Sequence, residues 1–274
     1  MIEYFDYPFF VNALWGVVLI SVASAIVGTY IVARRMVAIC GGITHACFGG
    51  LGLGCFMGWN PLAVAAAFAV GSSLGVEWLS ERQRLRQDSA IAVVWSLGMA
   101  LGVLFVFLTP GYVPELNSFL FGNILTVTRT DLWLFGGFTA VLASFFALNY
   151  RRIVAVAFDP DFARVAGLPV RLLQGVMSVL VAVCIVLAIR LVGVMLLMAV
   201  ISLPQLTAEV ACRRFGSIMA GSVAVSLVCS VAGLFLSMAV DVPCSALIVM
   251  FMGAAFAVAR CCRKMFKRPQ ADGN

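Results

Sequence analysis

The candidates for chemistry in this sequence are two ionisable side chains within apolar stretches. His45, the only histidine, lies in the glycine-rich stretch ICGGITHACFGGLGLG, and Glu209 lies in LPQLTAEVACRR. Ionisable groups inside a membrane usually face a bundle interior or an aqueous path. Imidazole is also the commonest metal-binding side chain, although one histidine alone does not make a metal site. The two residues are therefore candidates for lining an ion path.

Both residues also have a purely structural interpretation. The imidazole of His45 could donate a hydrogen bond to a carbonyl of the next helix and serve only packing. Glu209 stands four residues before Arg213, the spacing at which an ion pair forms on one helix face. The residue types alone leave both alternatives open.

The composition places these residues in a membrane protein. Hydrophobic residues make up 63% of the 274 residues and charged residues 11%, whereas soluble domains have about 45–50% and about 25%. The 18 Lys and Arg residues stand in short clusters between apolar runs, which is typical of membrane topology signals and does not indicate a nucleic-acid partner. We therefore expect an integral membrane protein in contact with lipid.

The apolar runs predict an all-α fold, a polytopic bundle of about nine transmembrane helices. Crossing the hydrocarbon core takes about 20 helical residues. The runs that satisfy this length are 10–32, 38–58, 61–78, 89–108, 132–149, 173–190, 193–211, 217–238 and 243–260. The division between the sixth and seventh runs is the weakest, because only Leu191 and Val192 separate them.

The charge distribution predicts an N-terminus outside and a cytoplasmic C-terminus. With nine spans, all of the 18 Lys and Arg residues except Arg129 and Arg190 then lie on the cytoplasmic side, as positive charges prefer. We expect one transmembrane permease domain over residues 1–260 and a short basic cytoplasmic tail over 261–274.

A row of small residues runs along the second predicted span. Gly42, Ala46, Gly50 and Gly54 are spaced by four, so they form one stripe on a helix. Small stripes let membrane helices approach closely. We expect this stripe to be a helix-packing surface, with His45 on the neighbouring row.

Two loops are long enough to have structure. The loop 109–131 contains an apolar patch and either lies in the membrane interface or dips back toward the core. In the loop 150–172, Asp159 precedes a proline and suits an N-cap. A short helix over 161–166 is expected to follow and to end at Gly167.

No catalytic machinery is visible in the sequence. It has no Walker A loop, no HExxH or GxSxG motif and no paired carboxylates inside the spans. We therefore expect a protein that is not an enzyme and whose energy comes from a separate partner.

Several stretches resemble one known family. They are VARRMVAICGGITHACFGGLGLG (32–54), DSAIAVVWSLGMALGVLF (88–105), NSFLFGNIL (117–125), DPDFARVAGLPV (159–170), LVGVMLLMAVISLPQLTAE (191–209) and DVPCSALIVM (241–250). In this order they resemble the permease subunits of bacterial ABC importers for zinc, manganese and iron(II). The likeness covers about nine-tenths of the chain.

The resemblance implies a complete importer in the bacterial cytoplasmic (inner) membrane. Two copies of the chain would form the pathway as a homodimer, with cytoplasmic ATP-binding subunits and an extracytoplasmic metal-binding protein as partners. Asp159, Ala163 and Gly167 correspond to the ATPase-docking loop of that family. No cofactor would be bound permanently, because the divalent metal ion (Zn, Mn or Fe) is the cargo.

The resemblance also implies that His45 is a transient metal ligand. Many members of that family have an aspartate one turn before the histidine, and here that position is Gly41. No carboxylate is therefore transferred to this site.

The leading functional hypothesis is the transmembrane subunit of an ATP-binding-cassette importer for a divalent transition-metal ion. One alternative is a proton-coupled secondary metal transporter, with His45 and Glu209 in a relay. Another is an ABC permease for a larger cargo such as a metal chelate. These alternatives predict different energy sources and different cargoes.

Overall fold

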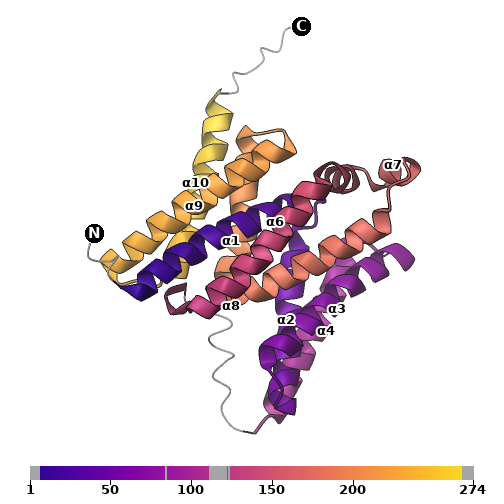
Figure 1. Cartoon of the computed structure of the whole chain (residues 1–274), viewed down its shortest axis with the longest axis horizontal. Coiled ribbons are helices and arrows are strands. Elements are labelled where there is room, and N and C mark those ends of the chain that lie inside the picture. The colour runs from indigo at the N-terminus through magenta and orange to yellow at the C-terminus, as the bar shows by residue number, and fades with distance from the viewer. Residues whose placement is uncertain (1–6, 84, 111–121, 123, 267–274) are drawn as a thin grey trace.

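The computed structural model describes residues 7–83, 85–110, 122 and 124–266 (Figure 1). These residues are almost entirely helical and contain no strand, which confirms the predicted all-α class. The elements are α1 Pro8–Ala33, α2 Val37–Met57, α3 Pro61–Arg82, α4 Gln87–Leu108, η2 Ile124–Thr126, α6 Arg129–Phe158, α7 Pro160–Val165, α8 Val170–Ala211, α9 Phe215–Val240 and α10 Cys244–Phe266. Eight of them are long and apolar enough to cross a membrane.

The longest element, α8, contains two of the predicted spans. Its 42 residues would extend about 63 Å as one helix, about twice the hydrocarbon thickness. Gly193 interrupts the helical backbone with φ 75° and ψ 170°, a conformation that glycine adopts readily. The two arms, 170–192 and 194–211, run in different directions (Figure 1). They correspond to the predicted sixth and seventh spans.

Two helices extend beyond the predicted spans. Helix α6 continues from the predicted end at residue 149 to Phe158, because no glycine or proline interrupts the chain before Asp159-Pro160. Helix α10 continues to Phe266, so the first residues of the predicted tail 261–274 are helical. Residues 267–274, and 111–121 and 123 of the predicted loop 109–131, lie outside the described part.

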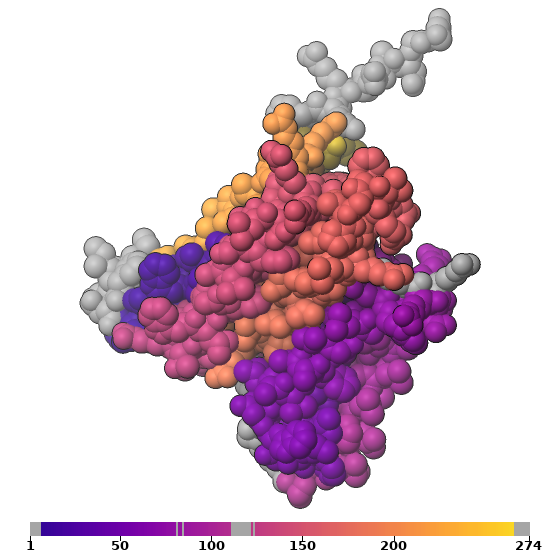
Figure 2. Space-filling view, turned by 45° about the vertical axis from the view of Figure 1, so that its right-hand side comes forward, coloured from indigo at the N-terminus to yellow at the C-terminus, as the bar shows by residue number. Residues whose placement is uncertain are grey.

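Helices α2 and α8 form the centre of the bundle. α2 contacts α3, α4 and α8, whereas α1 contacts α6, α8 and α9. In the space-filling view, α2 and its neighbours α3 and α4 gather at the lower right, in purple to magenta, next to the orange of α8 (Figure 2). The second span is therefore held from several sides.

One end of the bundle brings together the starts of α1 and α6 and the break in α8. The Asn12 amide donates a hydrogen bond to the carbonyl of Val127, with 3.2 Å between the atoms. The guanidinium of Arg190 lies 2.7 Å from the carboxylate of Asp131. The same carboxylate accepts hydrogen bonds from Thr128 in a capping box that begins α6. The carboxylate of Asp131 thus fixes the start of α6 against α8.

Candidate functional site

Helices α2 and α4 approach each other through small residues. A Cβ placed on Gly98 would lie 2.5 Å from Cα of Ala46, and one placed on Gly52 would lie 2.6 Å from the carbonyl oxygen of Gly102. Real Cβ atoms essentially never come this close. The two backbones can therefore adopt this spacing only because side chains are missing at these positions.

The predicted small-residue stripe contacts two helices in succession. Gly42 faces Ile91 of α4, and Gly98 of α4 lies against Ala46, whereas Gly50 and Gly54 face α3. Positions four residues apart advance by about 40° around a helix with 3.6 residues per turn. The stripe therefore turns around α2, and its two ends pack on different neighbours.

His45 points from α2 toward α4, where its imidazole stacks on the indole of Trp95. The ring centroids are 4.6 Å apart, and the ring planes differ by 6°. His45 is partly buried, and Trp95 is 39% exposed near the middle of α4. Beside them, Met198 of α8 occupies the space next to Gly41, because a Cβ on Gly41 would lie 2.9 Å from its terminal methyl carbon. Residues of α4 and α8 thus meet beside Gly41, one turn before the single histidine.

The structure places Glu209 near the end of α8, with its side chain exposed. Among the residues that the structure describes, no ion pair joins it to Arg213 and no hydrogen bond or ion pair joins it to His45. α2 and α8 pack against each other. The two candidates therefore lie on contacting helices.

The predicted short helix is α7, one residue earlier than the expected 161–166. The carboxylate of Asp159 accepts a hydrogen bond of 2.9 Å from the N–H of Phe162 and caps the helix. Gly167 ends it with φ 79°, where a side chain would be strained. Ala163 is fully buried, while Phe162 and Val165 are 67% and 89% exposed. α7 is a rigid turn with an apolar face open to the surroundings.

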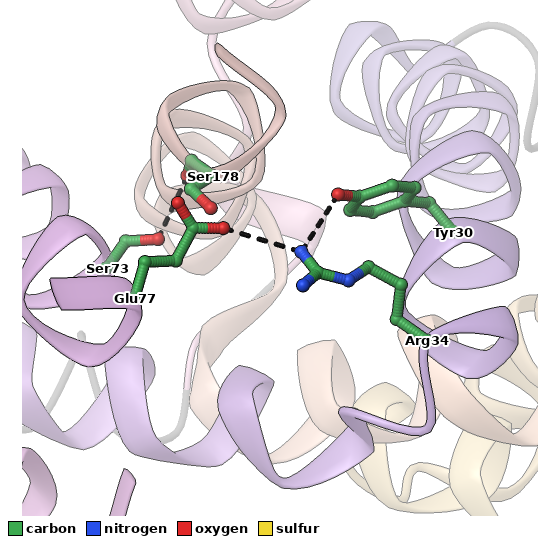
Figure 3. A network of polar contacts seen from close by, with 5 residues as sticks. All are labelled: Tyr30, Arg34, Ser73, Glu77 and Ser178. Atoms are coloured by element: carbon green, nitrogen blue, oxygen red, sulfur yellow. Dashed lines mark hydrogen bonds and ion pairs between the residues drawn. The ribbon is translucent and has the colours of Figure 1, made fainter. Parts of the chain in front are cut away.

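A polar network that the sequence analysis missed joins α1 to α3. The guanidinium of Arg34 lies 3.4 Å from the carboxylate of Glu77 and donates a hydrogen bond of 3.1 Å to the hydroxyl of Tyr30 (Figure 3). The hydroxyl of Ser73 donates a hydrogen bond to the carbonyl of Ser178, which joins α3 to α8. The sequence contains one indication of this network, because Glu77 is the only carboxylate within the predicted span 61–78.

A small cavity lies beside this network. Its volume of about 10 Å³ has room for roughly one water molecule. Tyr30, Arg34, Ser73 and Ser178 are among its lining residues. The cavity is too small to hold a metal ion with its hydration shell, so it does not compete with His45 as a candidate site.

No preformed metal centre is present in the described part of the chain. No group of three or more His, Cys, Asp and Glu side chains in that part is arranged to hold a metal ion. A structural zinc site needs four such ligands.

The sequence was compared with known proteins. The chain is 33% identical over 268 residues to a probable metal transport system membrane protein of Chlamydia pneumoniae, covering 94% of this chain and 89% of the relative. It is 28% identical over 254 residues to the manganese transport system membrane protein MntC of Halalkalibacterium halodurans, covering 93% and 87%. These likenesses extend over nearly all of each chain.

This chain also resembles a solved structure and matches a known protein family. The fold superposes on a chain of PsaBC from Streptococcus pneumoniae in complex with Fab, with a TM-score of 0.82, 26% identity and coverage of 94% of this chain and 95% of that chain. Residues 6–263 match the family described as ABC 3 transport family. That match includes His45, α7 and Glu209. The chain therefore belongs to the ABC 3 transport family and is a multi-pass membrane protein.

Proposed function

We propose that this chain is the transmembrane subunit of an ATP-binding-cassette importer that carries a divalent transition-metal ion across the bacterial cytoplasmic membrane. The observation that carries the proposal is the family match over residues 6–263. Relatives of nearly equal length are named as metal and manganese transport proteins. His45 fits such a cargo, because imidazole binds transition metals. Among the described residues, no group of three or more His, Cys, Asp and Glu side chains could hold such an ion permanently.

The energy source is a separate ATPase that docks on α7. Its exposed side chains, Phe162 and Val165, offer an apolar contact, while the buried Ala163 anchors the helix to the bundle. α7 lies between α6 and α8, only one residue after the end of α6. A rigid short helix in this position would transmit a movement of the ATPase to both membrane helices.

The N-terminus lies outside and the C-terminus and α7 lie in the cytoplasm. Arg129 and Arg190 are the two basic residues expected outside. The ion pair between Arg190 and Asp131 supports one shared location for them, since Asp131 is two residues from Arg129. Nearly all other Lys and Arg residues then lie on the cytoplasmic side, as the positive-inside rule requires.

The translocation path forms between two copies of the chain. His45 and Glu209 line it, His45 near the middle of the membrane and Glu209 at the cytoplasmic end. The tight packing of α2 through Gly42, Ala46, Gly50 and Gly54 supports this arrangement, because it holds the His45 helix rigidly. An extracytoplasmic metal-binding protein delivers zinc, manganese or iron(II) to this path.

The test is uptake into proteoliposomes that contain the complex of permease, ATPase and delivery protein. Radioactive Zn²⁺, Mn²⁺ and Fe²⁺ are offered with ATP, with a non-hydrolysable ATP analogue, or with a pH gradient alone. The proposal predicts uptake of at least one ion only with hydrolysable ATP. Uptake driven by the pH gradient alone would support a secondary transporter instead, and uptake only of chelated metal would support a chelate permease.

A further inference from the structure

His45 shares its surroundings with residues of α2, α4 and α8. The indole of Trp95 stacks on its imidazole. A Cβ on Gly41, one turn before His45, would lie 3.6 Å from the sulfur of Met198 and 3.7 Å from Cζ3 of the same Trp95 ring. The thioether and the indole therefore both lie beside Gly41, and the indole in turn stacks on the imidazole. We call Gly41, His45, Trp95 and Met198 the His–Trp–Met cluster.

The second arm of α8 presents one open stripe on which Met198 lies. Five exposed or partly exposed residues of this arm recur at intervals of three or four, the spacing of one helix face: Met195, Met198, Ser202, Leu206 and Glu209. Leu203, Val210 and Ala211 are also exposed or partly exposed. Most other residues of the arm are buried. Met198 lies within this stripe, and Glu209 lies at its end, two residues before the end of α8. Met198 is therefore not fully enclosed by the bundle.

Trp95 is placed to orient His45 rather than to anchor the helix at the membrane surface. Tryptophans that mark the membrane interface stand near helix ends, as Trp59 and Trp133 do here, whereas Trp95 lies near the middle of α4. A flat stack covers one face of the imidazole and leaves the ring edge uncovered. Metal ions bind imidazole nitrogens at that edge, in the plane of the ring. The stack thus fixes the ring without blocking its nitrogens.

We propose, building on the proposed import function, that the His–Trp–Met cluster selects the ion and favours the borderline-soft Zn²⁺ over the hard Mn²⁺. Imidazole and thioether ligands suit softer ions, whereas carboxylate and carbonyl oxygens suit manganese. His45 supplies a nitrogen and Met198 a sulfur, and Gly41 supplies no side chain but leaves room for the thioether.

The cluster binds its ion only weakly. The described residues contain no group of three or more His, Cys, Asp and Glu side chains that could hold a metal ion. An ion therefore meets few ligands at this point of each chain. Weak binding is what a conduit requires, because the ion must leave again.

The test is equilibrium binding of radioactive Zn²⁺ or Mn²⁺ to the purified chain in lipid nanodiscs. The wild type is expected to bind Zn²⁺ more tightly than Mn²⁺. Met198→Leu keeps the size of the side chain and removes the sulfur. It should weaken Zn²⁺ binding by about tenfold, because changes around a metal ligand typically lower metal affinity by about that factor. Mn²⁺ binding should remain unchanged. The matched control is Met250→Leu, at an exposed position of α10, which should change neither.

A second variant keeps the sulfur and moves it. In Gly41→Ala, the new Cβ would lie 2.9 Å from the terminal methyl carbon of Met198, so the flexible thioether must shift. Gly41→Ala should therefore bind Zn²⁺ more weakly than the wild type, as Met198→Leu should. Retention of the wild-type preference in both variants would overturn the role of Met198. Tighter binding of Mn²⁺ than of Zn²⁺ by the wild type, or no binding of either ion, would overturn the proposed selectivity.

Failure of this inference differs from failure of the import function. ATP-driven uptake that prefers Mn²⁺ would overturn the selectivity and leave the import function standing. Absence of ATP-driven uptake of every metal ion would remove the import function itself, whatever the nanodisc measurement gives.

Discussion

The guanidinium of Arg34 and the carboxylate of Glu77 meet at 3.4 Å, between the end of α1 and the C-terminal part of α3 (Figure 3). The two residues are 43 positions apart. Their side chains are only 11% and 17% exposed, so the pair is largely withdrawn from solvent. Tyr30 adds a hydrogen bond to the same guanidinium. The pair therefore joins α1 to α3, which both pack against α8.

Removal of the carboxylate should destabilise the protein. Breaking a fully buried ion pair by deleting one partner costs roughly 3–5 kcal/mol, and the partial exposure of this pair lowers the expectation to about 2 kcal/mol for Glu77→Ala. The measurement is unfolding of the purified protein in detergent. Asp161→Ala is the matched control, because its pair with Arg164 is exposed and should contribute nothing measurable. Equal effects of both substitutions would contradict the structural role of Glu77.

Even one added methyl group on α2 should disturb its packing. In Gly50→Ala, the new Cβ would lie 2.6 Å from Cβ of Phe68 and 2.7 Å from Cα of Ala65. Overpacking of this kind costs about 1–3 kcal/mol. The control is Gly71→Ala on α3, where a Cβ would meet nothing within 4 Å. Thermal unfolding in detergent should separate the two variants, and equal midpoints would show that α2 and α3 are not in close contact at Gly50.

A change at the end of α7 should uncouple ATP hydrolysis from transport. Gly167 has φ 79° and donates its N–H to the carbonyl of Arg164. Proline has no N–H and requires φ near −65°, so Gly167→Pro cannot keep this turn. We expect the complex to assemble, with metal uptake reduced by about tenfold or more per ATP hydrolysed. Normal uptake and hydrolysis in an intact complex would remove the docking role of α7.

Loss of the imidazole should affect transport without affecting assembly. His45 is partly buried and packs on Trp95 through one ring face. His45→Ala removes the candidate metal ligand and leaves the small-residue contacts of α2 unchanged. The complex should form in normal yield, and its rate of metal uptake should fall by about tenfold or more. Uptake at the wild-type rate would instead favour a packing role for His45.

Features set by local sequence could be predicted. The apolar runs predicted the long membrane-capable helices, because span length follows from membrane thickness. The Asp159-Pro160 start and the Gly167 end of α7 were predicted within one residue, since caps depend on neighbouring residues. The close packing along α2 also follows from residue spacing.

Features set by contacts between distant helices could not be predicted. The partner of Arg34 stands on another helix, and neither side chain identifies the other. The stacking of Trp95 on His45 and the position of Met198 beside Gly41 depend on how α2, α4 and α8 pack together. The length of α6 was underestimated, because basic residues at 151 and 152 look like a loop although nothing there ends a helix.

The most direct test of the account is the location of α7 relative to the membrane. Val165→Cys places a thiol at a position that is 89% exposed, in a background with Cys261 and Cys262 changed to serine because both are exposed. Thr130→Cys, at an exposed position near the start of α6, is the control for the outer side. A membrane-impermeant thiol reagent on spheroplasts should label position 130 at once and position 165 only after permeabilisation. Labelling of position 165 in sealed spheroplasts would place α7 outside, where no ATPase could reach it, and would contradict the account.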